Sequence, residues 1–371
     1  MKKNLIPLLT VLLFYACTPM ENPSVALYGV SIDQKNVSID FGASYTLHAT
    51  VTPKRSNDNL TLVWTSGNPA IVAIDQNGVL TALGHGEATI SVIATSAEKS
   101  FTATCNVKVV PAVVNIPDEA FRNYCLQIAD ANRDSILTTD ETSIVTRISV
   151  NNMNISSLEG LRYFPALLDL SCGSNQLTSL DVRANPALQY LSCGSNQLTS
   201  LDVRANPALQ YLSCGSNQLT GLDVSANPAL QTLSCSYNPL TGLDVSANPA
   251  LKYCLCNHNQ LTDIDMSANP VLQILSCAYN QLTILDVSAN PELQDLSCSY
   301  NQLTGLDVSA NPALRNLSCS YNQLTSLDVS ANSTLQYLYC SYNSFLTTVW
   351  LKTGQTVANL TKDSHTDIKY K

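Results

Sequence analysis

Charged residues are scarce in this sequence, and basic ones are scarcer than acidic ones. Asp and Glu number 28 against 19 Lys and Arg, which gives a formal net charge of −9. Binding to nucleic acid depends on clustered Lys and Arg, so this balance argues against such a partner. Histidine is also rare, and the four copies lie in different parts of the chain: His48, His85, His258 and His365. No Ser-His-Asp, phosphate-loop or paired-carboxylate pattern accompanies them, which argues against an enzyme.

One unit of 21 residues, by contrast, repeats without a slip from Ala166 to Asn343. Successive units begin at Ala166, Ala187, Ala208, Ala229, Ala250, Val271, Glu292 and Ala313, and a degraded ninth begins at Thr334. A fixed period of this length indicates a solenoid. Stacked parallel strands lie about 4.8 Å apart, so each position of the unit becomes a column along the stack. A Pro after the second Asn of most units suits a turn and leaves no room for a long helix.

Each unit contains two related frames, L-x-C-x-x-N-x-L and L-D-V-x-x-N. The alternating Leu and Cys of the first frame predict a strand with one buried face, and no coil buries that face without neighbours. We expect the Asn of the first frame to bond the turning backbone, because an unsatisfied buried amide costs about 1–3 kcal/mol. The unit therefore predicts strands on one side of the solenoid and short extended or 3₁₀ segments on the other.

These frames resemble the leucine-rich repeats, most closely those of bacterial surface proteins such as the internalins. The resemblance covers about half of the chain, residues 145–343. It implies a scaffold with a parallel sheet that binds a ligand, most often another protein, and that works without a required cofactor.

Nine of the thirteen cysteines occupy one column of the repeat. They alternate with Leu on the inward face, where Cys behaves as a small hydrophobe. Side chains in one column point the same way, which disfavours disulfides between neighbours. We predict free core thiols at Cys172, Cys193, Cys214, Cys235, Cys256, Cys277, Cys298, Cys319 and Cys340.

Eight aspartates form a second column: Asp181, Asp202, Asp223, Asp244, Asp265, Asp286, Asp307 and Asp328. Unit charges about 5 Å apart in water repel by less than about 1 kcal/mol. That cost is tolerable if each carboxylate bonds a nearby hydroxyl or amide, so we favour an outward structural ladder over a calcium-binding ladder.

The start of the chain has the charge and length of a signal peptide over residues 1–16. Phe14-Tyr15-Ala16-Cys17 looks like a loose lipobox of the kind common in Bacteroidetes, which implies a lipid on Cys17 and a linker over 17–26. Thr18 in place of Asp favours an outer-membrane lipoprotein of the cell envelope, facing either the cell surface or the periplasm, with the lipid as its one contact with the membrane. Ordinary cleavage with a soluble product is the alternative.

Residues 27–110 alternate in strand periodicity and lack the repeat. Gly42 to Leu47, Val63 to Ser66 and Gly86 to Ile90 resemble the bacterial Ig-like group 2 domains, which implies a seven-stranded β-sandwich around Trp64 that serves as a spacer. The fold class is therefore mainly β, with a sandwich, a small helical cap and a solenoid in turn.

The helical cap is predicted over 111–144, where Pro117 and Asp118 mark a helix start. Within it, residues 130–141 resemble an EF-hand or dockerin-type loop, with candidate calcium ligands Asp130, Asn132, Asp134 and Ile136 and Glu141 at position 12. Ser135 stands where that loop prefers Gly. A structural calcium ion and an empty loop of the same shape both remain open. Residues 344–371 are predicted to cap the other end.

Two variable columns carry the candidate ligand-binding residues, on the concave face or its rim: Tyr190, Tyr211, Tyr237, Tyr253, His258, Tyr279, Tyr300, Tyr321, Tyr337 and Tyr342. Tyrosine combines a rigid contact area with a hydroxyl and suits protein or glycan surfaces. Simple duplication of the unit is the alternative explanation. Zinc at Cys254, Cys256 and His258 is disfavoured, because three ligands do not complete a structural zinc site.

The sequence thus predicts a lipid-anchored envelope protein that presents a leucine-rich-repeat solenoid for protein binding or adhesion. A glycan-binding surface lipoprotein beside an uptake system is one alternative. A structural envelope component without a dedicated ligand is the other.

Overall fold

The computed structural model describes residues 29–52, 60–96 and 99–371, and the described chain divides into two compact units between Ala112 and Val113. The predicted signal peptide over 1–16 and the whole predicted linker over 17–26, with Cys17, lie outside the described residues. None of the described helices has the length and apolar character needed to cross a bilayer.

The first unit is a set of short sheets with Trp64 in its core, 5% exposed. Its strands are β1 Gly29–Ile32, β2 Asn36–Asp40, β3 Ser44–Thr46, β4 Ala49–Thr52, β5 Thr61–Ser66, β6 Val72–Ile74, β7 Val79–Ala82, β8 Gly86–Thr95 and β9 Ser100–Val110. They form sheets of order β2-β9-β8-β5, β3-β7-β6 and β1-β4. Alternating residues of β8 and β9, such as Ile90 and Val107, fill the core between the sheets.

The described residues of this unit form nine strands, two more than the seven predicted for the sandwich. The two extra strands come from interruptions. The segment that starts the unit breaks after Ile32, so that β1 pairs antiparallel with β4 whereas β2 pairs parallel with β9. A second break at Leu47 and His48 separates β3, which pairs with β7, from β4. Counting β1 with β2 and β3 with β4 as single segments would give seven, and these two segments change pairing partner midway.

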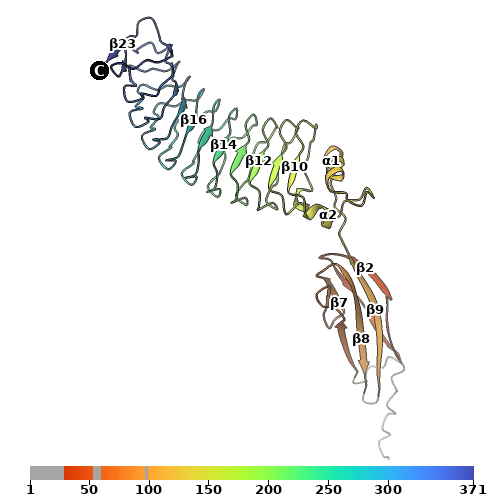
Figure 1. Cartoon of the computed structure of the whole chain (residues 1–371). Helices are drawn as coiled ribbons and strands as arrows, with labels where there is room; N and C mark the ends of the chain where they lie inside the picture. The colour runs from red at the N-terminus through yellow and green to blue at the C-terminus, as the bar shows by residue number, and fades with distance from the viewer. Residues whose placement is uncertain (1–28, 53–59, 97–98) are drawn as a thin grey trace, which may run out of the picture. The chain divides into compact units, whose positions relative to one another are not determined.

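Two helices open the second unit: α1 Glu119–Ala129 and α2 Thr139–Ser143. The helix α1 begins after Asp118, whose side chain accepts the backbone N–H of Phe121 as an N-cap. Phe121 is fully buried and contacts Phe164, so α1 packs over the apolar end of the first coils (Figure 1). A 3₁₀ turn, η1 Leu161–Tyr163, follows before the regular repeats.

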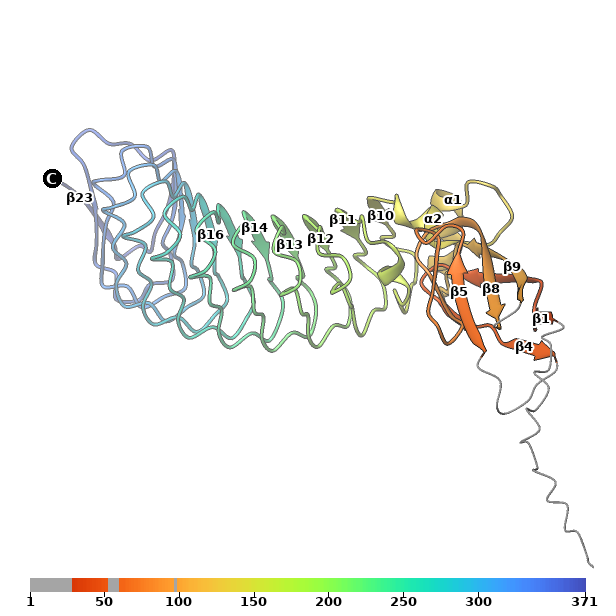
Figure 2. The ribbon, with the colours of Figure 1, turned by 90° about the horizontal axis from the view of Figure 1, so that it is seen from below.

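The coils form one parallel sheet of eleven strands. Strands that are consecutive in this sheet lie beside one another (Figure 2). They are β10 Arg147–Ser149, β11 Asp169–Ser171, β12 Tyr190–Ser192, β13 Tyr211–Ser213, β14 Thr232–Ser234, β15 Tyr253–Leu255, β16 Ile274–Ser276, β17 Asp295–Ser297, β18 Asn316–Ser318, β20 Tyr337–Tyr339 and β22 Asn359–Thr361. From β11 to β20 each strand pairs in register with the next coil, for example Tyr190 with Tyr211. The predicted solenoid and its columns are confirmed.

The core of the solenoid is built from the predicted inward columns. Leu191 and Cys193 are fully buried, as are the corresponding residues of the coils around them. All nine column cysteines are buried and free, in agreement with the predicted thiols.

Two columns of asparagine hold neighbouring coils together. Asn217 of the first column accepts the N–H of Leu198 from the preceding coil at 3.0 Å and donates to the carbonyl oxygens of Cys193 and Cys214. Asn206 of the second column donates to two carbonyl oxygens, while its own oxygen has no hydrogen-bond partner in the described chain. Each amide thus spans the gap between coils, which is the structural role predicted for the first column.

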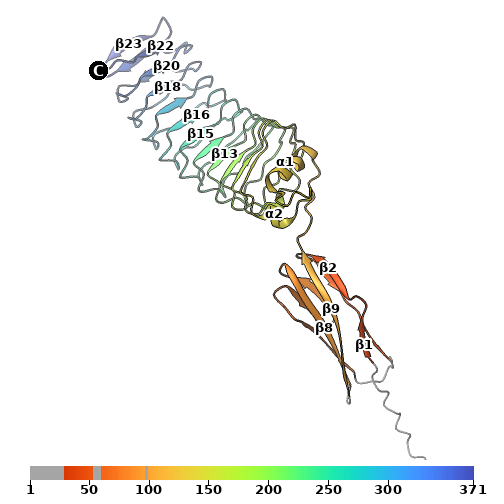
Figure 3. The same cartoon turned by 45° about the vertical axis from the view of Figure 1, so that its right-hand side comes forward.

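The stack continues beyond Asn343, where the sequence predicts only a cap. The strand β22 adds to the main sheet beside β20 (Figure 3). The strands β21 Thr348–Leu351 and β23 Asp367–Tyr370 join β19 Ser326–Asp328 in a second parallel sheet. The last coils escaped prediction because the step from Tyr337 to Asn359 is not 21 residues and the Leu-Asp-Val frame is lost. Asp363 follows β22, and its carboxylate accepts the N–H groups of Tyr342 and Asn343, whose equivalents in the regular coils bond backbone carbonyl oxygens of the next coil.

Candidate ligand-binding surface of the solenoid

Six aromatic rings form a continuous stack along one rim of the sheet. Their ring centroids lie 4.0 to 4.2 Å apart and their planes are within 13° of parallel, for Tyr237, His258, Tyr279, Tyr300, Tyr321 and Tyr342. We call this row the aromatic ladder. The spacing follows from the stacked coils, which place one ring of each coil directly over the next. The five tyrosines are exposed, from 37% at Tyr300 to 61% at Tyr342.

The backbone of the ladder is left-handed. Every ladder residue has a positive φ, between 52° at His258 and 60° at Tyr237, and so do Ser174, Ser195 and Ser216 in the earlier coils. Glycine or asparagine is the usual residue in this conformation, because other side chains crowd the backbone there. The turn needs this conformation because the N–H of Tyr300 must reach the carbonyl oxygen of Ser320 in the next coil. Stacking between the rings offsets part of the backbone cost.

The ladder presents hydroxyls and ring edges in an uncharged setting. Stacking sets the phenol groups in a row, and there the hydroxyl of Tyr300 raises the pKa of Tyr279, and the hydroxyls of Tyr300 and Tyr342 raise the pKa of Tyr321. The turn segments around the rings, such as 298–303, carry Ser, Asn and Gln and no Asp, Glu, Lys or Arg. This rim can therefore donate and accept hydrogen bonds without charge.

The other predicted tyrosines lie on the sheet face, at the first position of their strands. Tyr190 and Tyr211 stack at 4.2 Å and form a second aromatic pair near the start of the solenoid. Tyr253 and Tyr337 stand in the same row of the sheet but three coils lie between them. The candidate residues thus separate into a six-ring rim, one pair, and two single rings.

Between Tyr253 and Tyr337 the sheet face is hollowed. The hollow has a volume of about 400 Å³ and lies over β16, β17 and β18, with Leu255 at one end and Tyr339 at the other. Its floor is formed by three small residues at the third strand position: Ser276, Ser297 and Ser318. Leu255 and Tyr339 occupy the same row and have larger side chains. The first strand positions contribute Ile274, Asp295 and Asn316. We call this feature the sheet hollow.

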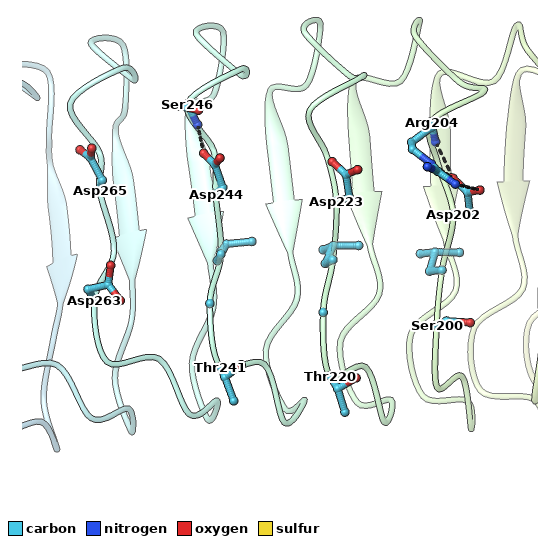
Figure 4. A pocket seen from close by; sticks show the side chains of 15 residues that line it. Ser200, Asp202, Arg204, Thr220, Asp223, Thr241, Asp244, Ser246, Asp263 and Asp265 are labelled. Atoms are coloured by element: carbon cyan, nitrogen blue, oxygen red, sulfur yellow. Dashed lines mark hydrogen bonds and ion pairs between the residues drawn. The ribbon is translucent and has the colours of Figure 1, made fainter.

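A second groove lies on the opposite side of the coils, along the aspartate column (Figure 4). Its side chains include Asp202, Asp223, Asp244 and Asp265, with Arg204 bound to Asp202 through two hydrogen bonds. In every column coil the Asp accepts the N–H of the residue two places later, as Asp244 does from Ser246. These bonds hold the pKa of the column carboxyls below its usual range, down to about 2 at Asp202, where Arg204 is the main cause. The predicted role of the column in the turns is consistent with these bonds.

The three residues considered for zinc lie in different parts of the coil. Cys254 and Cys256 are buried in the core, whereas His258 stacks in the ladder between Tyr237 and Tyr279, so the three do not meet. In the described part of the chain, no three His, Cys, Asp or Glu side chains are grouped to hold a metal ion.

The loop at 130–141 keeps the shape of a calcium loop through its own hydrogen bonds. Asp130 accepts the N–H groups of Asp134 and Ser135. Glu141 accepts the N–H of Ala131 through one carboxylate oxygen and the N–H and hydroxyl of Thr138 through the other. Bidentate coordination by Glu141 would therefore compete with its capping bonds, and calcium at this loop stays a prediction.

The sequence-based prediction named only the aromatic residues of the two variable columns as site residues, and so left out Asp295, Leu255, Ser297 and Tyr339. The signal was present, because Leu255 and Tyr339 depart from the Ser that most coils carry at the third strand position. Only the sheet register brings these departures to the two ends of one hollow.

Comparisons with known proteins identify both units of the chain. Residues 26–107 match the bacterial Ig-like domain (group 2), and residues 186–227 match the leucine-rich repeats. The functional domain of InlJ from Listeria monocytogenes, which includes a cysteine ladder, is similar in structure, with a TM-score of 0.59 and 37% identity over 64% of this chain and 55% of that one. Internalin C2 of the same organism is a weaker match, with a TM-score of 0.48 and 21% identity over 59% of this chain and 91% of that one.

A protein of Clostridium acetobutylicum is 36% identical over 104 residues, which cover 28% of this chain and 24% of that protein. The chain thus spans about a quarter of that relative and little more than half of the InlJ structure. Taken together, the chain carries a group 2 Ig-like domain followed by leucine-rich repeats similar to those of internalins.

Proposed function

We propose that this chain is a non-enzymatic cell-envelope lipoprotein whose solenoid binds a protein partner through the sheet face and the aromatic ladder. The observation that carries the proposal is the ladder itself. Five tyrosines and one histidine occupy left-handed backbone positions where glycine would be less strained, and they leave their edges and hydroxyls exposed. Backbone strain of this kind is concentrated at functional sites.

The stacking favours protein over glycan as the ligand class. Sugars pack on the faces of aromatic rings, but inner rings such as Tyr300 have both faces covered by their neighbours, at 4.1 Å and 4.0 Å. Only the end rings, Tyr237 and Tyr342, have a face that no other ring of the ladder covers. Tyrosine edges with hydroxyls on a rigid frame match protein interfaces, in which tyrosine is enriched.

The remaining elements of the proposal concern placement in the envelope. A lipid on Cys17 would hold the chain at the outer membrane, and the Ig-like unit would serve as a spacer for the solenoid. The support is the apolar run that ends at Ala16-Cys17. Adhesion to another cell or to a host surface would be one use of such a presented solenoid.

The test compares one chain with two variants on a protein array and on a glycan array. The ladder variant combines Tyr279→Ala with Tyr300→Ala, and the control combines Asp286→Asn with Asp307→Asn on the opposite side of the coils. Each lost anchor should weaken protein binding by about 2 kcal/mol, whereas the control should bind like the original chain. Circular dichroism at the assay temperature verifies that both variants are folded. Binding to glycans alone, or binding that survives in the ladder variant and fails in the control, would contradict the proposal.

A further inference from the structure

The sheet hollow breaks the uniformity of an otherwise duplicated array. The third strand position reads Ser in β11 to β14 and in β16 to β18, but Leu255 and Tyr339 close off the stretch of Ser276, Ser297 and Ser318 between them. The first position of the same three strands reads Ile274, Asp295 and Asn316 in place of the Tyr or Thr of β12 to β15. Duplication alone would repeat one residue along each row, so these departures mark a local specialisation.

The chemistry of the hollow is apolar with one negative charge. Leu255, Ile274 and Tyr339 supply its apolar surfaces. Asp295 is its one carboxylate, half-buried at the first position of β17. The amide of Asn316 donates to this carboxylate, and within the described residues no Lys, Arg or His forms an ion pair with it. The carboxylate therefore has room for a cationic partner.

The floor offers few free hydrogen-bonding groups. The hydroxyl of Ser276 donates to Asn257 at 2.9 Å, and the hydroxyl of Ser318 is bonded to that of Ser299 at 2.8 Å. That leaves Ser297 as the one floor hydroxyl without a hydrogen bond to the described part of the chain. A polyhydroxylated ligand would find few partners here, whereas a side chain with an apolar stem and a cationic head would match both the walls and the charge.

We propose that the sheet hollow binds a lysine or arginine side chain of the protein partner, with its stem against Ile274 and its cationic head at Asp295. This inference rests on the proposed function and names the residue class that the partner must present. Eight of the 12 acidic residues in 166–343 form the aspartate column on the opposite side of the coils, so the charge that favours a cation in the hollow is that of Asp295 itself. Arg315, the nearest basic residue in sequence to the hollow, has an exposed side chain and makes no ion pair with the described residues. Complementary charge of this kind steers a basic partner to its site.

The experiment selects peptides from a displayed random library on the whole chain in detergent. We expect the selected peptides to share a Lys or Arg at one fixed position. Asp295→Asn should then weaken binding of a selected peptide roughly ten- to a hundredfold, the range for a lost charge-assisted hydrogen bond. Asp307→Asn removes the same charge from the opposite side of the same coil and should leave the affinity unchanged.

A second pair of variants tests the space itself. Ser297→Tyr fills the hollow with a side chain that the same row already accepts at Tyr339, and Ser192→Tyr places it in the same row outside the hollow. The first should abolish binding of the selected peptide and the second should not. Selected peptides without a shared basic residue, or equal affinity for the Asp295→Asn variant and the original chain, would overturn this inference and leave the proposed function standing. A library that yields no binding peptide would overturn both.

Discussion

The thiol column makes the stability of the solenoid sensitive to alkaline pH. Burial raises the pKa of all nine column cysteines above the ordinary value of 9.0, to about 12 at Cys172 and Cys340 and well above 9.0 at the seven between them. At Cys256 the neighbouring thiol of Cys254 is the largest cause. The perturbation is therefore a simple rise in pH above 9.

The sign of the effect follows from which state holds its protons. Above pH 9 the thiols of the unfolded chain ionise, while the buried thiols of the folded solenoid stay protonated. Ionisation stabilises the unfolded state and not the folded one. The free energy of unfolding is therefore at its full value below pH 9 and falls as the pH rises toward the pKa values of the folded state. Above pH 9, each thiol lowers the free energy of unfolding by about 1.4 kcal/mol per pH unit. Nine thiols together lower it by about 12 kcal/mol per pH unit, which is comparable with the whole stability of a typical domain.

Urea unfolding followed by circular dichroism between pH 7 and pH 10.5 measures this slope. We expect little change up to pH 8.5, and loss of the solenoid signal roughly one pH unit above 9. Cys298→Ala removes one titrating group and should lower the slope by about one ninth, or about 1.4 kcal/mol per pH unit. A stability that stays constant from pH 8 to pH 10.5 would refute the reasoning and place the thiols in contact with solvent.

Three further predictions concern the ladder, the amides and the anchor. Tyr300→Ala loses two stacked contacts and should lower the free energy of unfolding by about 1–3 kcal/mol in urea; an Ala variant as stable as the original chain would mean that stacking contributes nothing. Tyr300→Gly also relieves the left-handed backbone and should be more stable than the Ala variant by about 1 kcal/mol, and equal stability of the Gly and Ala variants would mean that the backbone there is not strained. Asn217→Ala leaves the buried N–H of Leu198 without an acceptor and should lower the free energy of unfolding by at least about 2 kcal/mol. The exposed Gln218→Ala should lower it by less than about 0.5 kcal/mol, and hydrogen exchange at the Leu198 amide reports the difference. Cys17→Ala should move the chain from the detergent phase to the aqueous phase, and an original chain already found in the aqueous phase would exclude the lipid.

The repeat made most of the solenoid predictable from sequence. A 21-residue period turns each position into a column, so the burial of Leu191, Cys193 and their equivalents follows from one unit. The same logic predicted that the column tyrosines would share one rim. Where the period fails, at the step from Tyr337 to Asn359, the prediction fails too, and the sequence indicates a cap where the structure has further coils.

The site was harder to predict because it depends on departures from the repeat. The ladder required the knowledge that residues such as Tyr300 are left-handed, which one sequence does not reveal. The sheet hollow required the register that sets Leu255 and Tyr339 four strands apart in one row, with Asp295 between them in the neighbouring row. A periodic sequence predicts which residues share a column. A hollow in the sheet face depends in addition on which residues in neighbouring coils have small side chains.

The most direct test of the account locates the partner on the solenoid. A photo-crosslinking phenylalanine analogue replaces Tyr339, which already places an aromatic ring at one end of the sheet hollow. In a second chain it replaces Ser246 on the opposite side, and each chain is irradiated with a peptide selected on the original chain. We expect a crosslinked product from position 339 and none from position 246. Crosslinking from position 246 with none from position 339 would contradict this expectation and move the binding surface to the aspartate groove.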